Sequence, residues 1–354
     1  MIGAHDPRRL AGQRGYILAL NIAVLAMMMV GAAYMGKRMS LAIDLARTER
    51  QRVDGDLAML SARSRVLYLL AAAPRTRRGL GDLPEKSVAL DGRWYRVGKN
   101  VSVSLQDARG LISVNGAALL GDLGRDRVER LFGTYGLQPN EIASLVDNLL
   151  DYRDSDDLKR INGAEKSEYA QRGKEVNLRN ADLKAPTELA RILGYADLLM
   201  VPTEKDPVSN YVNMLPTAQF NPNTAGWRAL VAATGTTEEI AKNLVDARRS
   251  DETNDISGML FPGAANDPFG QGAGILSFPS DTIIVTFRYA NSPVGMRMAV
   301  KHTPAVESSA PWLIQYTYPV SIPGPGGAEQ EMPDLPDLSS LRDVGAPVRV
   351  QLPF

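Results

Sequence analysis

The chain has 354 residues, of which 44% are apolar and 23% are charged, and its formal net charge at pH 7 is zero. This length suffices for two or more folded units with their own cores, and the lack of a basic excess argues against a nucleic-acid-binding protein. Because the chain has no cysteine and only two histidines, His5 and His302, thiol catalysis and cysteine-ligated zinc are excluded, and a Ser-His-Asp triad is disfavoured.

Residues 16–36, YILALNIAVLAMMMVGAAYMG, form a run without one charged side chain. A helix of this run would be about 31 Å long, which matches the hydrocarbon thickness of a bilayer. Residues 37–73 continue with apolar side chains at three- and four-residue steps and charges between them, until Pro74 ends the pattern. We therefore predict one helix from residue 16 to about residue 73, which crosses a membrane once and carries a large soluble head.

A short basic leader precedes this run and ends in Gln13-Arg14-Gly15. No small-x-small cleavage site follows the run, so an ordinary cleaved secretory signal is not predicted, and the alternative is an uncleaved signal anchor. The leader also resembles that of type IV pilins and type II secretion pseudopilins. This resemblance implies that a prepilin peptidase cuts between Gly15 and Tyr16 and that the new N-terminus is methylated. Tyr16 replaces the usual Phe, and Leu20 stands where most members have Glu; the K-type minor pseudopilin is the member class that lacks this Glu.

Short strands are predicted after the helix. Residues 87–90 and 94–97 flank Asp91-Gly92, a hairpin signal, and residues 101–105 alternate as a half-buried strand does. Strands return at residues 282–289, where a β-branched run indicates a central strand, and then at residues 296–302 and 312–318. The Pro/Gly-rich end of the chain is predicted to be a mobile tail with a last edge strand at residues 347–352.

The chain between these strands is helical and contains a repeat. Helices are predicted at residues 117–123, 125–132, 140–152, 187–193, 225–233 and 237–249. The first copy runs from Ser113 to Asp157, and the second from Asn221 to Glu252; each reads as strand end, Asn, helix, Gly turn, amphipathic helix and acidic loop. We expect the Asn residues to cap helices. The pattern is that of a duplicated helix-hairpin-helix unit, and the modest cations and acidic loops beside it do not favour DNA binding.

One stretch carries a more specific resemblance. The K-type minor pseudopilin of the type II secretion system shows a G-x-I-x-x-N start, a helix ending in D-W/Y-x-D-x-D-D, then N-G-A-E and an aromatic residue. The matching residues here are Gly110, Ile112, Asn115, Asp151, Tyr152, Asp154, Asp156, Asp157, Asn162, Gly163, Ala164, Glu165 and Tyr169. Residues 220–225, FNPNTA, resemble the second motif of that family.

The resemblance implies a fold class and a domain order. The expected fold is α+β, with a pilin-like long N-terminal helix, an antiparallel sheet and a large inserted all-α domain (duplicated helix-hairpin-helix, SAM-like). The expected segments are the prepilin leader 1–15, the transmembrane half-helix 16–36, the amphipathic helix and first strands 37–109, the inserted domain 110–257, the C-terminal strands 258–320 and the tail 321–354.

Five acidic residues lie at and after the end of the helix predicted at residues 140–152, namely Asp151, Asp154, Asp156, Asp157 and Glu165. Hard oxygen ligands at alternating positions in a loop are what Ca²⁺ requires, and the resembled family is associated with structural calcium. Against this, Arg153, Lys159 and Arg160 lie among the acids as ion-pair partners, and the EF-hand spacing is absent. A structural Ca²⁺ site and an Asp-rich turn held by ion pairs both remain open.

We expect assembly rather than catalysis. The resemblance implies a minor pseudopilin at the tip of the type II secretion pseudopilus, in the inner membrane of a Gram-negative bacterium with its head in the periplasm. Its expected partners are the I- and J-type minor pseudopilins, the major pseudopilin and the prepilin peptidase, and no nucleic acid. The alternatives are a minor pilin or tip adhesin of a type IV pilus, a membrane-anchored DNA receptor, and an uncleaved anchor with an unrelated head.

Overall fold

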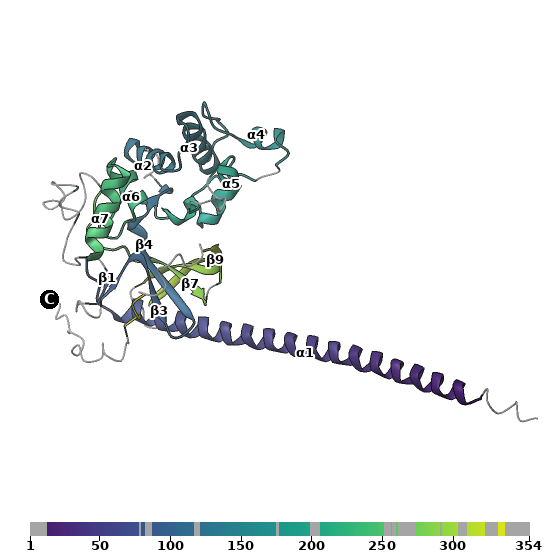
Figure 1. Cartoon of the computed structure of the whole chain (residues 1–354). Coiled ribbons are helices and arrows are strands. Elements are labelled where there is room, and N and C mark those ends of the chain that lie inside the picture. Colours follow the sequence, from purple (N-terminus) through teal and green to yellow (C-terminus); the bar gives the residue numbers. More distant parts are fainter. Residues whose placement is uncertain are drawn as a thin grey trace, which may run out of the picture. The chain divides into compact units, whose positions relative to one another are not determined.

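The computed structural model describes residues 13–77, 79–81, 87–116, 121–174, 177–198, 206–250, 256, 260, 274–290, 292–303, 310–322 and 332–336. The chain divides into two compact units, residues 1–58 and 59–354. Figure 1 labels their elements. The leader before residue 13, most of the loop at 258–274 and the edge strand predicted at 347–352 lie outside the described residues.

The described part of the first unit is entirely helical. Its helix, α1, spans Gln13–Ala72 and so includes the first residues of the second unit. Among the described residues it is the one helix long and apolar enough to cross a membrane, with a mean hydropathy of 2.1 over 18 residues. The protein does not bury this segment, since Met27 and Met35 are each 75% exposed. The helix ends just before Pro74, as predicted, because proline cannot continue the hydrogen-bond ladder.

The second unit contains a five-stranded antiparallel sheet in the order β3-β4-β7-β8-β9. Its strands are β3 (Asp91–Val97), β4 (Val101–Asp107), β7 (Thr282–Tyr289), β8 (Val294–His302) and β9 (Trp312–Ser321). β7 is the middle strand and is buried over almost its whole length, which confirms the prediction from its β-branched run.

The two faces of this sheet differ in character because side chains alternate along each strand. On one face Leu105, Val285 and Met298 are opposite one another in register, and all three are buried. Leu70, near the end of α1, lines a small cavity with Ile283 of the same face, so the last turns of the helix cover it. The opposite face carries the polar register partners Ser104, Thr286 and Arg297.

The hairpin predicted at Asp91-Gly92 is wrong. β2 (Val88–Ala89) pairs with β1 (Gly79–Leu80), and the two-residue signal itself belongs to β3. Gly92 has a φ of +82°, and the register of β3 against β4 shifts between Asp91 and Trp94. A glycine with positive φ fits a bulge as well as a hairpin turn, and here it forms the bulge. The real turn between β3 and β4 contains Gly98, whose φ is +71°.

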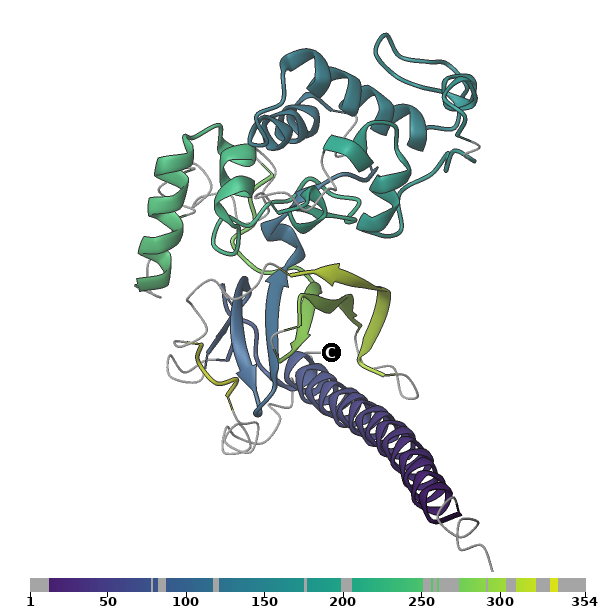
Figure 2. The same cartoon turned by 45° about the vertical axis from the view of Figure 1, so that its right-hand side comes forward.

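A large insertion separates β4 from β7, although the two strands are neighbours with Asp107 opposite Ile283. Figures 1 and 2 show its helices together on one side of the sheet. They enclose a core of their own that includes Phe132, Leu149 and Leu230. The elements are the short helix η3 (Ala108–Gly110), β5 (Ile112–Ser113), α2 (Asp122–Gly133), α3 (Pro139–Arg153), α4 (Lys166–Gln171), η5 (Pro186–Arg191), α5 (Tyr195–Leu198), η6 (Val208–Asn210), β6 (Val212–Asn213), α6 (Trp227–Thr234) and α7 (Glu238–Ser250).

Two helix pairs, α2–α3 and α6–α7, turn at Gly136 and Gly235, which both have positive φ. The helices α2, α3, α6 and α7 were predicted, residues 117–120 of the helix predicted at 117–123 lie outside the described residues, and the predicted Asn caps are wrong. Asn115 exchanges hydrogen bonds with the backbone of Leu183, and Asn221 donates to Asp107, while the N-caps of α2 and α6 are Gly121 and Gly226. The Asn residues therefore tie distant segments together instead of capping helices. The parallel pair β5–β6 and the helix α4 were not predicted.

Part of the expected mobile tail is ordered against the sheet. Asp334 forms a parallel bridge with Arg96 of β3, whose backbone exchanges hydrogen bonds of 2.9 Å with the backbone of Pro333 and Leu335. Leu335 is only 3% exposed, and Arg65 of α1 donates to its carbonyl oxygen at 3.1 Å. For residues 332–336 the prediction of mobility is wrong, because a composition rich in Pro and acids does not reveal one buried leucine.

Candidate functional site

The predicted processing site lies within α1. Gly15 and Tyr16 are both helical, and the helix begins two residues upstream of Gly15 at Gln13. Tyr16 is 73% exposed, and Leu20, at the position where a Glu was expected in most relatives, is 52% exposed. The apolar segment that begins at Tyr16 therefore presents an uncharged surface to its surroundings.

The predicted acidic loop connects α3 to α4 and is folded back on α3. Asp151 lies in the last turn of α3 with no exposed surface, and Asp154 forms the C-cap. Farther along the loop, the backbone and side-chain nitrogens of Asn162 donate to Asp147 Oδ2 at 3.2 and 3.3 Å. Ser144 donates to the carbonyl oxygen of Asn162 at 3.0 Å. These bonds fix the loop before it enters α4.

Arg160 pairs with the acids at the start of this loop. Its guanidinium donates to Asp151 Oδ1 at 2.6 Å and to Asp154 Oδ2, and its backbone nitrogen also donates to Asp151 at 3.2 Å. The other two cations of the segment, Lys159 and Arg153, pair with carboxylates outside the predicted set. Of the predicted neutralising partners, only Arg160 therefore bridges the acids of the loop.

Glu165, which immediately precedes α4, is buried, and neither of its carboxylate oxygens has a hydrogen-bond partner among the described residues. Burial, followed by the charges of Asp151, Asp154 and the two remaining acids of the loop, raises its pKa to about 7. Asp154 Oδ1 is likewise buried and unpartnered. One guanidinium therefore does not satisfy the carboxylates that this loop brings together.

The outer acids of the loop do not join this group. Asp156 and Asp157 are exposed, and Asp156 accepts a hydrogen bond from the backbone nitrogen of Leu158 at 2.9 Å. Across the described ranges, no set of three or more His, Cys, Asp or Glu side chains is arranged as a metal site. The structure brings Asp151, Asp154 and Glu165 into electrostatic contact but does not arrange them as ligands around one point.

A glycine beside the acids is sterically required. A Cβ on Gly163 would lie 1.9 Å from Asp151 Oδ2. The N-G-A-E segment can therefore pass this buried carboxylate only with glycine at its second position. This gives a physical reason for one residue of the motif that the sequence alone could only match.

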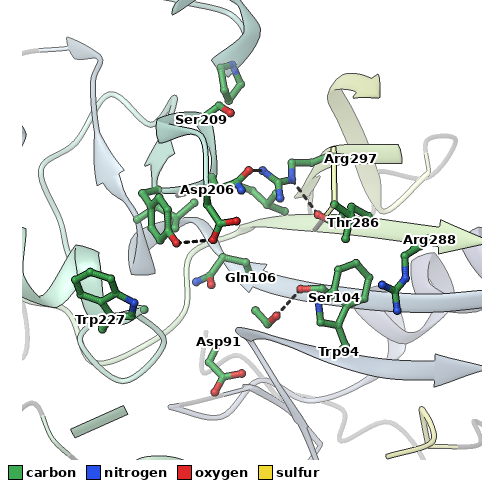
Figure 3. Close-up of a pocket in the computed structure, with 18 of the residues that line it drawn as sticks. Asp91, Trp94, Ser104, Gln106, Asp206, Ser209, Trp227, Thr286, Arg288 and Arg297 are labelled. Carbon is green, nitrogen blue, oxygen red and sulfur yellow. Dashed lines mark hydrogen bonds between the residues drawn. The ribbon is translucent and has the colours of Figure 1, made fainter. Parts of the chain in front are cut away.

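A cavity of about 700 Å³ lies between the polar face of the sheet and the insertion (Figure 3). Trp94 and Arg288 line it from the sheet, with the guanidinium 5.3 Å from the ring centre, and Trp227 lines it from α6. Arg297 Nε donates to Thr286 Oγ1 at 2.9 Å in the same wall. The arginines of the sheet wall are therefore engaged with neighbouring side chains.

A buried aspartate, Asp107, fixes the base of the insertion to the sheet, and we call it the clamp. The sequence did not predict this role. Asp107, the last residue of β4, is fully buried and accepts five hydrogen bonds of 2.8 to 3.1 Å. The donors are the backbone nitrogens of Arg109 and Ser280, the hydroxyls of Ser280 and Thr224, and the amide of Asn221. Because most of these partners are more than 100 residues away, no local pattern in the sequence marks this aspartate.

Comparison with known proteins connects this geometry to a family. Residues 111–201, which include the acidic loop, match the family described as "Type II secretion system (T2SS), protein K". The fold is similar to that of a chain in "The Crystal Structure of the GspK-GspI-GspJ complex from enterotoxigenic Escherichia coli Type 2 Secretion System", with a TM-score of 0.52 and 16% sequence identity. The similarity covers 78% of this chain and 99% of that chain. No curated protein matches the chain.

These findings confirm the α+β fold class, with a long N-terminal helix, an antiparallel sheet and further helices. The structural similarity supports the fold, and the match at residues 111–201 supports the family. The match includes Gly163, the residue that the buried carboxylate requires. Residues 111–201 therefore match the protein K family of the type II secretion system, and the fold of the chain is similar to that of a chain of the GspK-GspI-GspJ complex.

Proposed function

We propose that this chain caps the tip of a type II secretion pseudopilus and initiates its assembly for the export of folded proteins. The observation that carries the proposal is the insertion of a helical domain with its own core between two adjacent strands of a pilin-like sheet. An apolar first segment with Leu20 in place of Glu supports it, since a tip subunit has no subunit ahead of it to pair with such a carboxylate. The bulk of the insertion would block addition of another subunit above.

Assembly would begin with processing in the inner membrane. A prepilin peptidase would cut after Gly15, and the new N-terminus at Tyr16 would be methylated. The apolar part of α1 would remain in the inner membrane as a single span with the head in the periplasm, and it would pack against sister helices. Its partners would be the I- and J-type minor pseudopilins, as in the complex of the similar chain, followed by the major pseudopilin.

We further propose that the acidic loop holds one structural Ca²⁺. The buried, unpartnered oxygens of Glu165 and Asp154 fit a hard cation, and Asp151 lies beside them. Ca²⁺ and the Arg160 guanidinium would compete for the same carboxylates, so binding would require Arg160 to move outward. Water would complete the oxygen shell, because Asp156 and Asp157 are exposed and lie outside the buried group.

The tip function is tested in cells. Deletion of the gene is expected to block the release of secreted proteins into the medium, and the wild-type gene is expected to restore it. N-terminal sequencing of the purified protein should begin at Tyr16, and Gly15→Arg should leave the leader attached. A protein that begins at Met1 would indicate an uncleaved anchor. Loss of twitching with normal secretion would favour the alternative, a minor pilin or tip adhesin of a type IV pilus.

The calcium proposal is tested separately by thermal unfolding of the full-length protein in detergent. Calcium at one hundred times its Kd should add about 2.7 kcal/mol of stability to the wild type. Glu165→Gln should lose this gain, whereas the control Glu239→Gln, an exposed acid in the first turn of α7, should keep it. Equal calcium responses of the two variants would contradict the proposed site.

A further inference from the structure

Two aliphatic side chains project from the loop between α3 and α4. Leu158 is 77% exposed and Ile161 is 95% exposed, which makes Ile161 the most exposed of the large apolar side chains among the described residues. Single surface hydrophobes are common, but two on one short turn form a small apolar projection. We call Leu158 and Ile161 the aliphatic knob.

The backbone around the knob is held in place. The nitrogen of Leu158 donates to Asp156 Oδ1 at 2.9 Å, and the nitrogen of Gly163 donates to the carbonyl oxygen of Arg160 at 3.1 Å. The side chain of Lys159 pairs with Glu168 at 3.0 Å, and that of Arg160 pairs with Asp151. The backbone of Leu158 is therefore fixed within the loop, and Lys159 is tied to Glu168 of α4. A partner would meet a preorganised surface and would pay little ordering entropy.

Charges beside the knob indicate the chemistry of its partner. Lys159 and Arg160 form ion pairs within the protein. Asp156 and Asp157 are exposed, and neither forms a salt bridge with a cation among the described residues. The immediate rim of the knob is therefore acidic. In both views α3 and α4 lie on the side of the insertion away from the five-stranded sheet (Figures 1 and 2), so the knob is separated from the sheet edge.

We propose that the aliphatic knob is a docking site for a folded protein whose surface presents an apolar cup rimmed by Lys or Arg. The cup would bury Leu158 and Ile161, and the basic rim would face Asp156 and Asp157. Acidic neighbours disfavour insertion into an anionic membrane, which attracts basic segments. This proposal rests on the loop geometry and charge and does not depend on the position of the subunit at the tip.

The direct test places a photo-crosslinking amino acid at position 161 in the full-length chain in its native cells, with position 240 as control. Ile240 is also an exposed aliphatic residue of the insertion, 49% exposed on α7. Cross-links from position 161 to one protein are expected, and mass spectrometry should locate them in a segment with aliphatic residues flanked by Lys or Arg. Cross-links to lipid, to an acidic segment, or at the same yield from both positions would overturn the proposal.

A variant supplies the second measurement. Leu158→Ser/Ile161→Ser should unfold at the wild-type temperature, because neither side chain is buried, while Ile240→Ser serves as the matched control. For this variant the photo-crosslinking amino acid is placed at Ala170, an exposed position on α4. The yield of cross-linked partner should be lower by about tenfold or more in the double variant than in the wild type. Unchanged recovery would overturn the proposal. Secretion by a deletion strain restored with the wild-type gene is measured in parallel. This measurement tests the proposed tip function, whereas the cross-linking yield tests the knob, so the two proposals can fail separately.

Discussion

The clamp at Asp107 gives the most direct test of how the insertion is fixed to the sheet. In Asp107→Ala, five donors lose their acceptor in a fully buried site. The hydroxyls of Thr224 and Ser280 retain backbone carbonyl acceptors. The nitrogens of Arg109, Ser280 and Asn221 lose this partner, at about 1–3 kcal/mol for each buried group. The expected destabilisation is therefore about 3–9 kcal/mol.

The assay is urea unfolding of the full-length protein in detergent, followed by tryptophan fluorescence. Asp107→Asn is the matched control because it keeps one carbonyl oxygen for the nitrogens of Arg109 and Ser280 but turns a donor toward Asn221. It should lose about 1–3 kcal/mol. A loss below about 1 kcal/mol for Asp107→Ala, or equal losses for the two variants, would refute the assignment of Asp107 as the clamp.

Three further predictions concern separate contacts. Burial favours a higher pKa for Asp91. The hydrogen bond from Arg93 and the charges of the nearby guanidinium groups outweigh burial and hold the pKa of Asp91 below its usual value. The wild type should consequently lose stability as pH falls below about 4, and Asp91→Asn should lack that loss in urea unfolding; parallel pH profiles would contradict this. Leu335→Ala should cost about 2–4 kcal/mol because the side chain is buried, and a cost under about 0.5 kcal/mol would mean that the tail contact is dispensable. Gly163→Ala should cost about 1–3 kcal/mol by displacing Asp151, whereas Gly133→Ala, with no neighbouring atom within 4 Å, should be near neutral; equal effects would argue against the close approach.

The elements that the sequence revealed are those whose signal is local and repeated. The long apolar run and Pro74 marked α1 because helix length and termination depend on consecutive residues. The β-branched run marked β7 for the same reason, and the glycines at Gly136 and Gly235 marked the helix turns. Each of these signals draws on neighbours in the chain, so no tertiary information was needed.

The features that were missed depend on distant contacts. Asn is a common residue at helix caps, but the side chain of Asn115 forms hydrogen bonds with the backbone of Leu183, 68 residues away. Asp91-Gly92 favours a hairpin locally, yet pairing of β3 with β4 makes it a bulge. The acidic loop was found from its residue types, whereas its ion-pair arrangement around Arg160 could only be offered as one of two alternatives.

The pairing of Asp107 with Ile283 determines how the insertion is attached to the sheet. Because the two residues face each other across adjacent strands, the points where the chain departs from and rejoins the sheet are only about 5 Å apart. A turn of two residues would close the same gap, so the hydrogen-bond ladder is complete whatever lies between. The helical region is thus inserted into an intact strand pair, and a change in its length would leave every strand with its neighbours.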